Sequence, residues 1–211
     1  MTTDLSTASL RRLPRYLRLL VQLLEEGHRY VTSAELARRL AMDESLVRRD
    51  LAQTRFAGKP RVGFDVEALK AHLEHLLGLG TAKPAILIGA GRLGQALAAY
   101  RGFTEYGLQV RAVFDIDPEK IGRDVHGMTV QPLWTAPALV REERIQVAIL
   151  AVPADAAQGV ADLLADAGVP AFWNFSGYPL HLPAPVLVLN EDLSDSLAVL
   201  SFRLAQERDK G

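Results

Sequence analysis

Three glycines interrupt an apolar stretch at the spacing G-x-G-x-x-G, in the segment ILIGAGRLGQALAAY at residues 86–100. Gly89 would permit a tight turn, Gly91 would let phosphates approach the backbone, and Gly94 would let the next helix pack closely on the preceding strand. The free N–H groups at the start of that helix would then face the phosphates. The chemistry that this spacing predicts is the binding of a nucleotide through its pyrophosphate.

An acidic residue at the end of the next apolar run completes the pattern. Asp115, in AVFDID, follows the turn at the distance where a carboxylate accepts hydrogen bonds from the hydroxyls of an adenosine ribose. Its charge would repel a 2′-phosphate, which favours NAD over NADP. Two alternatives stay open: a glycine-rich turn that holds no ligand, and a site for coenzyme A or S-adenosylmethionine in the same crevice.

The sequence does not reveal a set of residues arranged for catalysis. A dehydrogenase needs a proton-transfer group near the site of hydride transfer, and none of the five histidines stands in such a pattern. His72 and His75 have the spacing of a solvated helical pair without a third metal ligand. We therefore expect a protein without catalytic residues or a metal; the alternative is a small NAD-dependent oxidoreductase.

The residues in front of the glycine turn are basic. Residues 11–61 carry 12 Lys or Arg against 6 Asp or Glu, a positive field suited to a polyanion. Asp43 would cap a helix from residue 44 to about residue 55. Its inward positions would be Leu46, Val47 and Leu51, and its outward positions Ser45, Arg48 and Arg49, which we expect to meet DNA.

Other helices must position that segment. A helix with Leu10, Leu13, Leu17, Leu20 and Leu24 on its buried face precedes a capped helix at residues 33–40, which Thr32 and Glu35 open as a capping box. Two short helices around a tight turn form a helix-turn-helix, whose second helix enters the major groove. FAGKPRVGFDV then predicts a hairpin that lays Lys59 and Arg61 on the phosphate backbone, as a wing. The alternative is a helical dimerisation module.

The rest of the chain alternates short apolar runs with helical stretches. This texture predicts an α/β fold: a winged-helix domain at residues 1–80, a Rossmann-like doubly wound parallel sheet at 81–190 and a C-terminal helix at 191–211. Leu193, Leu197, Leu200 and Leu204 form a seam on that last helix. We expect the seam to contact a second subunit; the alternative is packing on its own sheet.

Composition places the chain among soluble globular proteins, since 49% of its residues are hydrophobic and 23% are charged. No apolar run approaches the ~18 residues of a membrane span. The first residues lack the pattern of a secretory signal, and the chain has no cysteine. We expect a cytoplasmic protein without a membrane partner.

Taken together, the segments resemble the Rex family of redox-sensing transcriptional repressors. The resemblance is carried by GAGRLGQALAAY, VFDIDPEKIG, the run from AILAVPADAAQG to NFSGYPL, and LNEDL. It implies a homodimer with winged helices on palindromic operator DNA, NAD(H)-binding Rossmann domains and a swapped C-terminal helix. NADH would close the dimer and release DNA, whereas NAD+ would compete without doing so.

Site residues follow from the turn and from this resemblance. The expected cofactor contacts are Gly89, Ala90, Gly91, Arg92, Leu93, Gly94, Asp115, Ile116, Lys120, Ala151, Val152, Pro153 and Asn174. The expected DNA contacts are Ser45, Arg48, Arg49, Lys59 and Arg61. The resemblance further implies a switch between subunits that involves Arg18, Tyr100 and Asp192.

Overall fold

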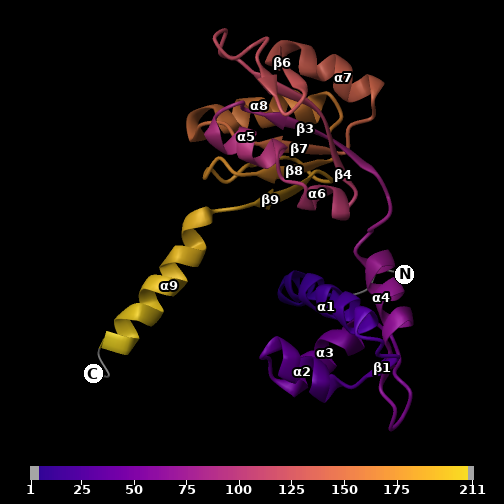
Figure 1. Cartoon of the computed structure of the whole chain (residues 1–211). Coiled ribbons are helices and arrows are strands. Elements are labelled where there is room, and N and C mark those ends of the chain that lie inside the picture. Colours follow the sequence, from indigo (N-terminus) through magenta and orange to yellow (C-terminus); the bar gives the residue numbers. More distant parts are fainter. Residues whose placement is uncertain (1–4, 209–211) are drawn as a thin grey trace. The chain divides into compact units, whose positions relative to one another are not determined.

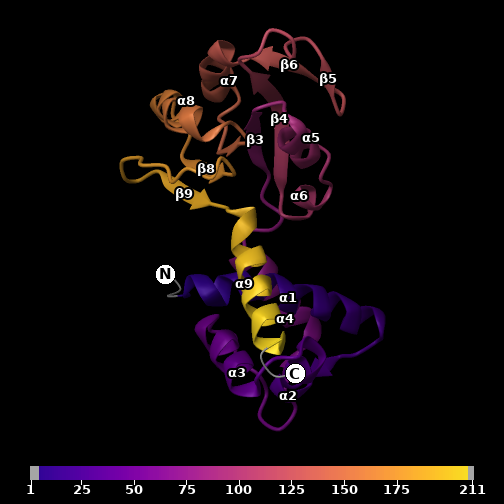
Figure 2. The same ribbon diagram turned by 90° about the vertical axis from the view of Figure 1, so that its left-hand side faces the viewer.

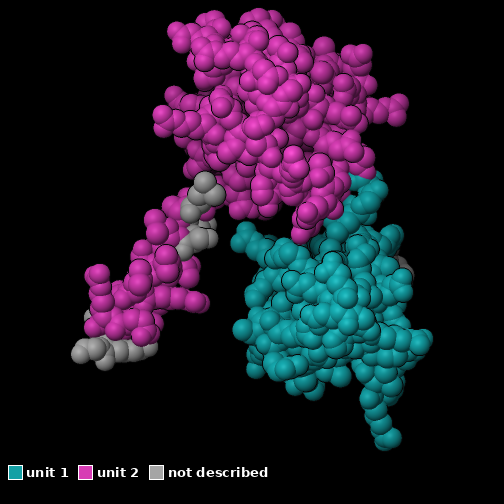
Figure 3. Space-filling model, in the orientation of Figure 1, with its two compact units in different colours: residues 1–81 teal, residues 82–211 magenta. Residues whose placement is uncertain are grey.

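A computed structural model describes residues 5–208 of the chain. The chain divides into two compact units, residues 1–81 and residues 82–211 (Figure 3). Each unit has its own hydrophobic core. The units are described separately below.

The first unit is helical with a two-stranded antiparallel sheet (Figure 1). Its elements are α1 (Thr7–Glu25), β1 (Tyr30–Val31), α2 (Ser33–Leu40), α3 (Glu44–Gln53), β2 (Phe64–Asp65) and α4 (Val66–Leu76). Both N-caps are present: Thr32 accepts from the N–H of Glu35, and Asp43 accepts from the N–H groups of Ser45 and Leu46. The expected capping box is present only in its Thr32 half, because the Glu35 carboxylate pairs with Arg38 and Arg39. These caps satisfy N–H groups that have no partner inside the helix, and so fix where α2 and α3 begin.

The buried face of α1 differs from the expected leucine seam. Leu13, Leu17 and Leu20 are buried as expected, but Leu10 is 39% exposed and Leu24 is only partly buried. The remaining buried apolar positions of α1 are Tyr16, Leu19 and Leu23. The expected seam stepped strictly by three and four residues, whereas burial also extends to the neighbouring positions of the stripe, as on a wide core-facing helix.

The second unit contains a sheet of seven strands in the order β5-β6-β4-β3-β7-β8-β9. The strands are β3 (Lys83–Ile88), β4 (Leu108–Asp115), β5 (Asp124–Val125), β6 (Met128–Pro132), β7 (Val147–Leu150), β8 (Ala171–Asn174) and β9 (Leu187–Asn190). All neighbours run parallel except β5, which pairs antiparallel with β6. This is the expected Rossmann-like α/β fold.

Helices cover both faces of this sheet. Figure 2 shows α5 (Arg92–Ala98) and α6 (Gly102–Glu105) on one side and α7 (Ala136–Glu142) and α8 (Ala154–Asp166) on the other. The chain leaves β3 towards β4 in one direction and later returns to β7 on its other side. Such a reversal opens a crevice at the carboxyl ends of the strands, where ligands bind in this architecture.

The last helix, α9 (Leu193–Arg208), is exposed along its described length. Leu197, Leu200, Phe202 and Leu204 each expose more than half of their surface. The alternative that this helix packs on its own sheet is therefore wrong. The side chain of Leu193, the first residue of the expected seam, is not among those that the structure describes.

No helix within residues 5–208 is long and apolar enough to cross a membrane. Within the same residues, no three His, Asp or Glu side chains are grouped as a metal ion would need.

Candidate nucleotide site and DNA interface

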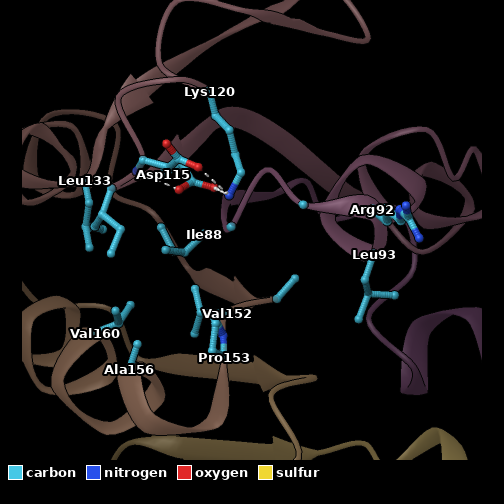
Figure 4. A pocket seen from close by; sticks show the side chains of 15 residues that line it. Ile88, Arg92, Leu93, Asp115, Lys120, Leu133, Val152, Pro153, Ala156 and Val160 are labelled. Carbon is cyan, nitrogen blue, oxygen red and sulfur yellow. Dashed lines mark hydrogen bonds and ion pairs between the residues drawn. The ribbon is translucent and has the colours of Figure 1, made fainter.

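A cavity of about 550 Å³ lies at the switch point of the sheet (Figure 4). It is bounded by the turn after β3, the end of β4, the residues after β7 and the start of α8. Its lining residues are Ile88, Gly89, Gly91, Arg92, Leu93, Asp115, Ile116, Asp117, Lys120, Leu133, Ala151, Val152, Pro153, Ala156 and Val160.

The three glycines differ in what surrounds them. Gly89 has a φ of +101°, and a Cβ on it would lie 2.3 Å from the carbonyl oxygen of Ala151. A Cβ on Gly94 would lie 1.8 Å from the carbonyl oxygen of Gly89. A Cβ on Gly91 would meet nothing within 4 Å. The first and third glycines are therefore required by the chain itself, whereas the second leaves open space at the cavity wall.

Asp115 ends β4 and is 6% exposed. Its Oδ2 accepts from the N–H of Ala90 at 2.7 Å, and its Oδ1 accepts from the N–H of Asp117 at 2.9 Å. Burial alone would raise the pKa of this carboxyl, but the two backbone N–H groups and the Lys120 ammonium outweigh burial, so the pKa lies below its ordinary value. Asp115 is an anion that the protein holds rigidly at the cavity edge.

Lys120 lies beside the Asp115 carboxylate at the cavity edge. Its Nζ lies 3.2 Å from Oδ2 of Asp115 and 3.4 Å from the nearer carboxylate oxygen of Asp117. Burial alone would lower the pKa of Lys120, but the two carboxylates outweigh burial, so the pKa lies above its ordinary value. Because each carboxylate oxygen can accept more than one hydrogen bond, Asp115 keeps capacity to bind a hydroxyl group.

Most of the expected cofactor residues lie on this cavity. The exceptions are Ala90, which contributes its N–H to Asp115, Gly94, which lies behind the turn, and Asn174. The sequence analysis missed Ile88, Asp117, Leu133, Ala156 and Val160, which also line it. The spacing of Ala156 and Val160, one helical turn apart just after Val152 and Pro153, is the signal that could have found the last two.

Asn174 borders a second, smaller hollow of about 160 Å³ with Tyr178, Asn190 and Asp192 among its lining residues. Its side-chain Nδ2 donates to the carbonyl oxygen of Tyr178 at 2.7 Å and to Oδ1 of Asn190 at 2.8 Å. Its Oδ1 accepts from the N–H of Ser176. The side chain thus ties the loop after β8 to the end of β9.

The expected DNA contacts lie on exposed surface of the first unit. Ser45, Arg48 and Arg49 are exposed on α3, while Val47 and Leu51 face the core; Leu46 is only partly buried. Lys59 pairs with Gly63 across a tight hairpin, and Arg61, at its tip, has a φ of +63°. The expected winged helix is thus present, with an exposed basic side on α3 and on its wing.

A buried polar network joins α3 to α1, and the sequence analysis did not identify it. Asp50 on α3 is fully buried and accepts from Arg12 Nε and Nη2, each at 2.6 Å, and from the Tyr16 hydroxyl at 2.8 Å. Burial raises the pKa of Asp50, but the hydrogen bonds from Arg12 and Tyr16 bring it below its ordinary value. Its spacing from Val47, three residues earlier on the inward face, was the available signal.

The three residues of the implied switch are exposed within their own units. Arg18 lies on the outer face of α1. Tyr100 follows α5, is 60% exposed and packs edge-on against Phe103. Asp192 precedes α9, where the hydroxyl and N–H of Ser194 lower the pKa of its carboxyl.

Two family models match the chain. One is described as a putative DNA-binding protein N-terminus and matches residues 4–52, and the other is described as a CoA binding domain and matches residues 81–177. The redox-sensing transcriptional repressor Rex of Chloroflexus aurantiacus is 40% identical over 200 residues, covering 95% of this chain and 94% of its own. The Rex protein of Thermoanaerobacter pseudethanolicus is 38% identical over 205 residues, covering 97% of this chain and 92% of its own.

Solved structures agree with these relatives. The crystal structure of RSP, a Rex-family repressor, is 38% identical and superposes with a TM-score of 0.88 over 98% of this chain and 97% of its own. RSP in complex with β-NADH gives a TM-score of 0.87, and RSP in complex with β-NAD+ and operator DNA gives 0.90. The chain therefore belongs to the Rex family of redox-sensing transcriptional repressors.

Proposed function

We propose that the chain is a DNA-binding repressor that senses the NADH/NAD+ ratio, with NADH binding releasing operator DNA. The observation that carries the proposal is that one chain combines a basic winged helix with a nucleotide cavity, and resembles over 98% of its length a repressor solved with NADH and with NAD+ and operator DNA. The relatives reported above are repressors, which favours this function over the oxidoreductase alternative.

The cavity fits an adenine dinucleotide in its chemistry. The open space at Gly91 and the N–H groups that begin α5 would receive the pyrophosphate. The anionic Asp115 would accept from the ribose hydroxyls, and its charge disfavours a 2′-phosphate. The apolar wall of Ile88, Leu133 and Val160 suits an adenine ring. The nicotinamide would lie towards Asn174, as the family resemblance implies.

We further propose that the chain works as a homodimer built around α9. That helix exposes large apolar side chains, which a solvated helix does not need. The edge strand β9 also exposes Leu187 and Leu189, and Leu189 pairs beside Trp173 of β8. A second copy of the chain would bury both surfaces, and its two-fold symmetry would match a palindromic operator.

Signalling in such a dimer is a matter of linkage. A ligand shifts the DNA-binding equilibrium only by its differential affinity for the two dimer arrangements. NADH and NAD+ differ by a hydride and by one positive charge on the nicotinamide, so discrimination belongs to the segment around Asn174. Arg18, Tyr100 and Asp192, all exposed, would make or break contacts as the subunits rearrange.

A second candidate is a regulator that binds coenzyme A, which the family model described as a CoA binding domain favours. Calorimetric titration with NADH, NAD+ and coenzyme A separates the two. We expect both NADH and NAD+ to bind. Asp115→Ala should lower the affinity for both by at least about tenfold, because a hydrogen bond to a charged group is lost. Asp166→Ala, an exposed acid on α8, serves as control. Unchanged affinity in Asp115→Ala, or tighter binding of coenzyme A, would contradict the NAD assignment.

A further inference from the structure

The first turn of α3 is acidic, although it lies at the end of a recognition helix that approaches base edges. Glu44 is its first residue. The Glu44 Oε1 accepts from Arg48 Nη2 at 2.5 Å and from the Ser33 hydroxyl at 3.1 Å. The Ser33 oxygen in turn accepts from Arg48 Nε at 3.3 Å. The three side chains close a ring between the start of α2 and the outer face of α3.

This ring uses one edge of the Arg48 guanidinium, made of Nε and one hydrogen of Nη2. Within residues 5–208, the Nη1 of this side chain makes no hydrogen bond, and the side chain remains 68% exposed. The edge made of Nη1 and Nη2 is therefore available. A guanidinium edge of this kind matches the O6 and N7 acceptors of guanine in the major groove.

Glu44 also changes which part of DNA the arginine prefers. An unrestrained arginine is drawn to phosphates, and phosphate contacts carry no sequence information. A carboxylate that touches the guanidinium repels a phosphate, which carries a full negative charge, more strongly than it repels the O6 and N7 acceptors of guanine, which carry only partial charges. Arg49 makes no salt bridge or side-chain hydrogen bond in the described part of the chain, and the Asp43 carboxylate interacts with it only electrostatically. Its hydrogen-bond donors therefore remain available to a phosphate.

We propose that Glu44, held by Ser33, is a positioning residue that directs Arg48 to a guanine of the operator and disfavours its contact with phosphate. Glu44 thereby determines sequence specificity rather than raw DNA affinity. The inference rests on the proposed DNA-binding function. As an exposed pair one helical turn apart, Glu44 and Arg48 contribute little to the stability of α3, so an effect on specificity is separable from an effect on folding.

The test compares binding of the full-length chain to its selected operator and to unrelated duplex DNA, over a range of salt concentrations. The operator is first obtained by selection from random DNA with the wild-type chain. We expect Glu44→Ala to lower the ratio of specific to non-specific affinity by about tenfold. We also expect it to strengthen non-specific binding and to steepen its salt dependence by about one phosphate contact. Ser33→Ala should change the affinity ratio and the non-specific binding in the same directions, but by a smaller amount.

Glu67→Ala is the matched control, because Glu67 is an exposed acid in the first turn of α4. It should leave the ratio unchanged. The inference is overturned if Glu44→Ala keeps the ratio while its thermal midpoint shows a folded protein, or if Glu67→Ala lowers the ratio equally. Replacing the contacted guanine by 7-deazaguanine should weaken operator binding by the wild-type chain more than it weakens operator binding by the Glu44→Ala variant. A wild-type chain that selects no sequence contradicts the proposed function itself, and this inference with it.

Discussion

Gly91 and Gly94 stand three residues apart in one turn, yet a methyl group would meet different surroundings at each. At Gly94 it would collide with the backbone of Gly89, whereas at Gly91 it would enter open space. The glycine spacing alone predicted both roles, because each follows from the geometry of a strand-to-helix turn. The apolar wall residue Leu133 could not be predicted, since only the folded sheet brings it to the turn.

This contrast yields a prediction about two alanine variants. Gly94→Ala should lower the thermal midpoint of the chain, because nothing but backbone movement relieves the contact with the Gly89 carbonyl oxygen. Gly91→Ala should leave the free energy of unfolding within about 0.5 kcal/mol of the wild type. It should weaken the binding of NADH and NAD+ by about tenfold or more. Differential scanning calorimetry and ligand titration measure both. A Gly91→Ala chain that binds NADH normally would show that the pyrophosphate does not lie there.

At the scale of single elements, α3 depends on α1. Its N-terminal end and length could be predicted from the Asp43 cap and the apolar spacing, and both were close to the observed Glu44–Gln53. The spacing of Asp50 from Val47 could place this acid on the inward face, but its partners could not be predicted, because the sequence of α3 does not reveal that Arg12 and Tyr16 of α1 will bind it. Short elements such as β1, β5 and α6 were also missed, because they depend on pairing or tight turns that their own few residues do not indicate.

The Asp50 network makes the first unit sensitive to acid. The pKa of Asp50 is lower in the folded chain than its ordinary value, so the unfolded chain binds more protons at acidic pH. The stabilisation is therefore complete above about pH 5 and is lost as the pH falls through about 4 and below. Asp50→Asn should cost about 3–5 kcal/mol at pH 7 and should remove this part of the acid dependence.

Hydrogen exchange of α1 and α3 in increasing urea, at pH 7 and at pH 4, measures that loss. Glu25→Gln removes an exposed acid from α1 and should behave as the wild type. An Asp50→Asn chain as stable as the wild type at pH 7 would mean that the network contributes little net stability.

At the scale of the whole molecule, the chain is a pair of units plus a helix that lacks a partner within the described residues. The leucine seam of α9 predicted a partner surface from the sequence, and its exposure fits that expectation. Which surface of a second copy it would contact could not be predicted, because such a contact would lie outside a single chain.

The dimer proposal predicts the effect of a charge in this seam. Leu200→Glu should halve the mass in sedimentation equilibrium and weaken operator binding, because a carboxylate would be buried without a partner. Gln206→Glu, on the exposed end of the same helix, is the control. A wild-type monomer, or a Leu200→Glu chain that remains a dimer, would contradict the assignment of α9 to the interface.

The most direct test of redox sensing is operator binding at fixed total NAD(H) with a varied NADH/NAD+ ratio. We predict that the fraction of operator bound falls as the ratio rises, since only NADH favours the arrangement that releases DNA. The same experiment with Asp115→Ala should show a weaker response. Equal loss of binding with NADH and NAD+, or no loss with either, would contradict the account.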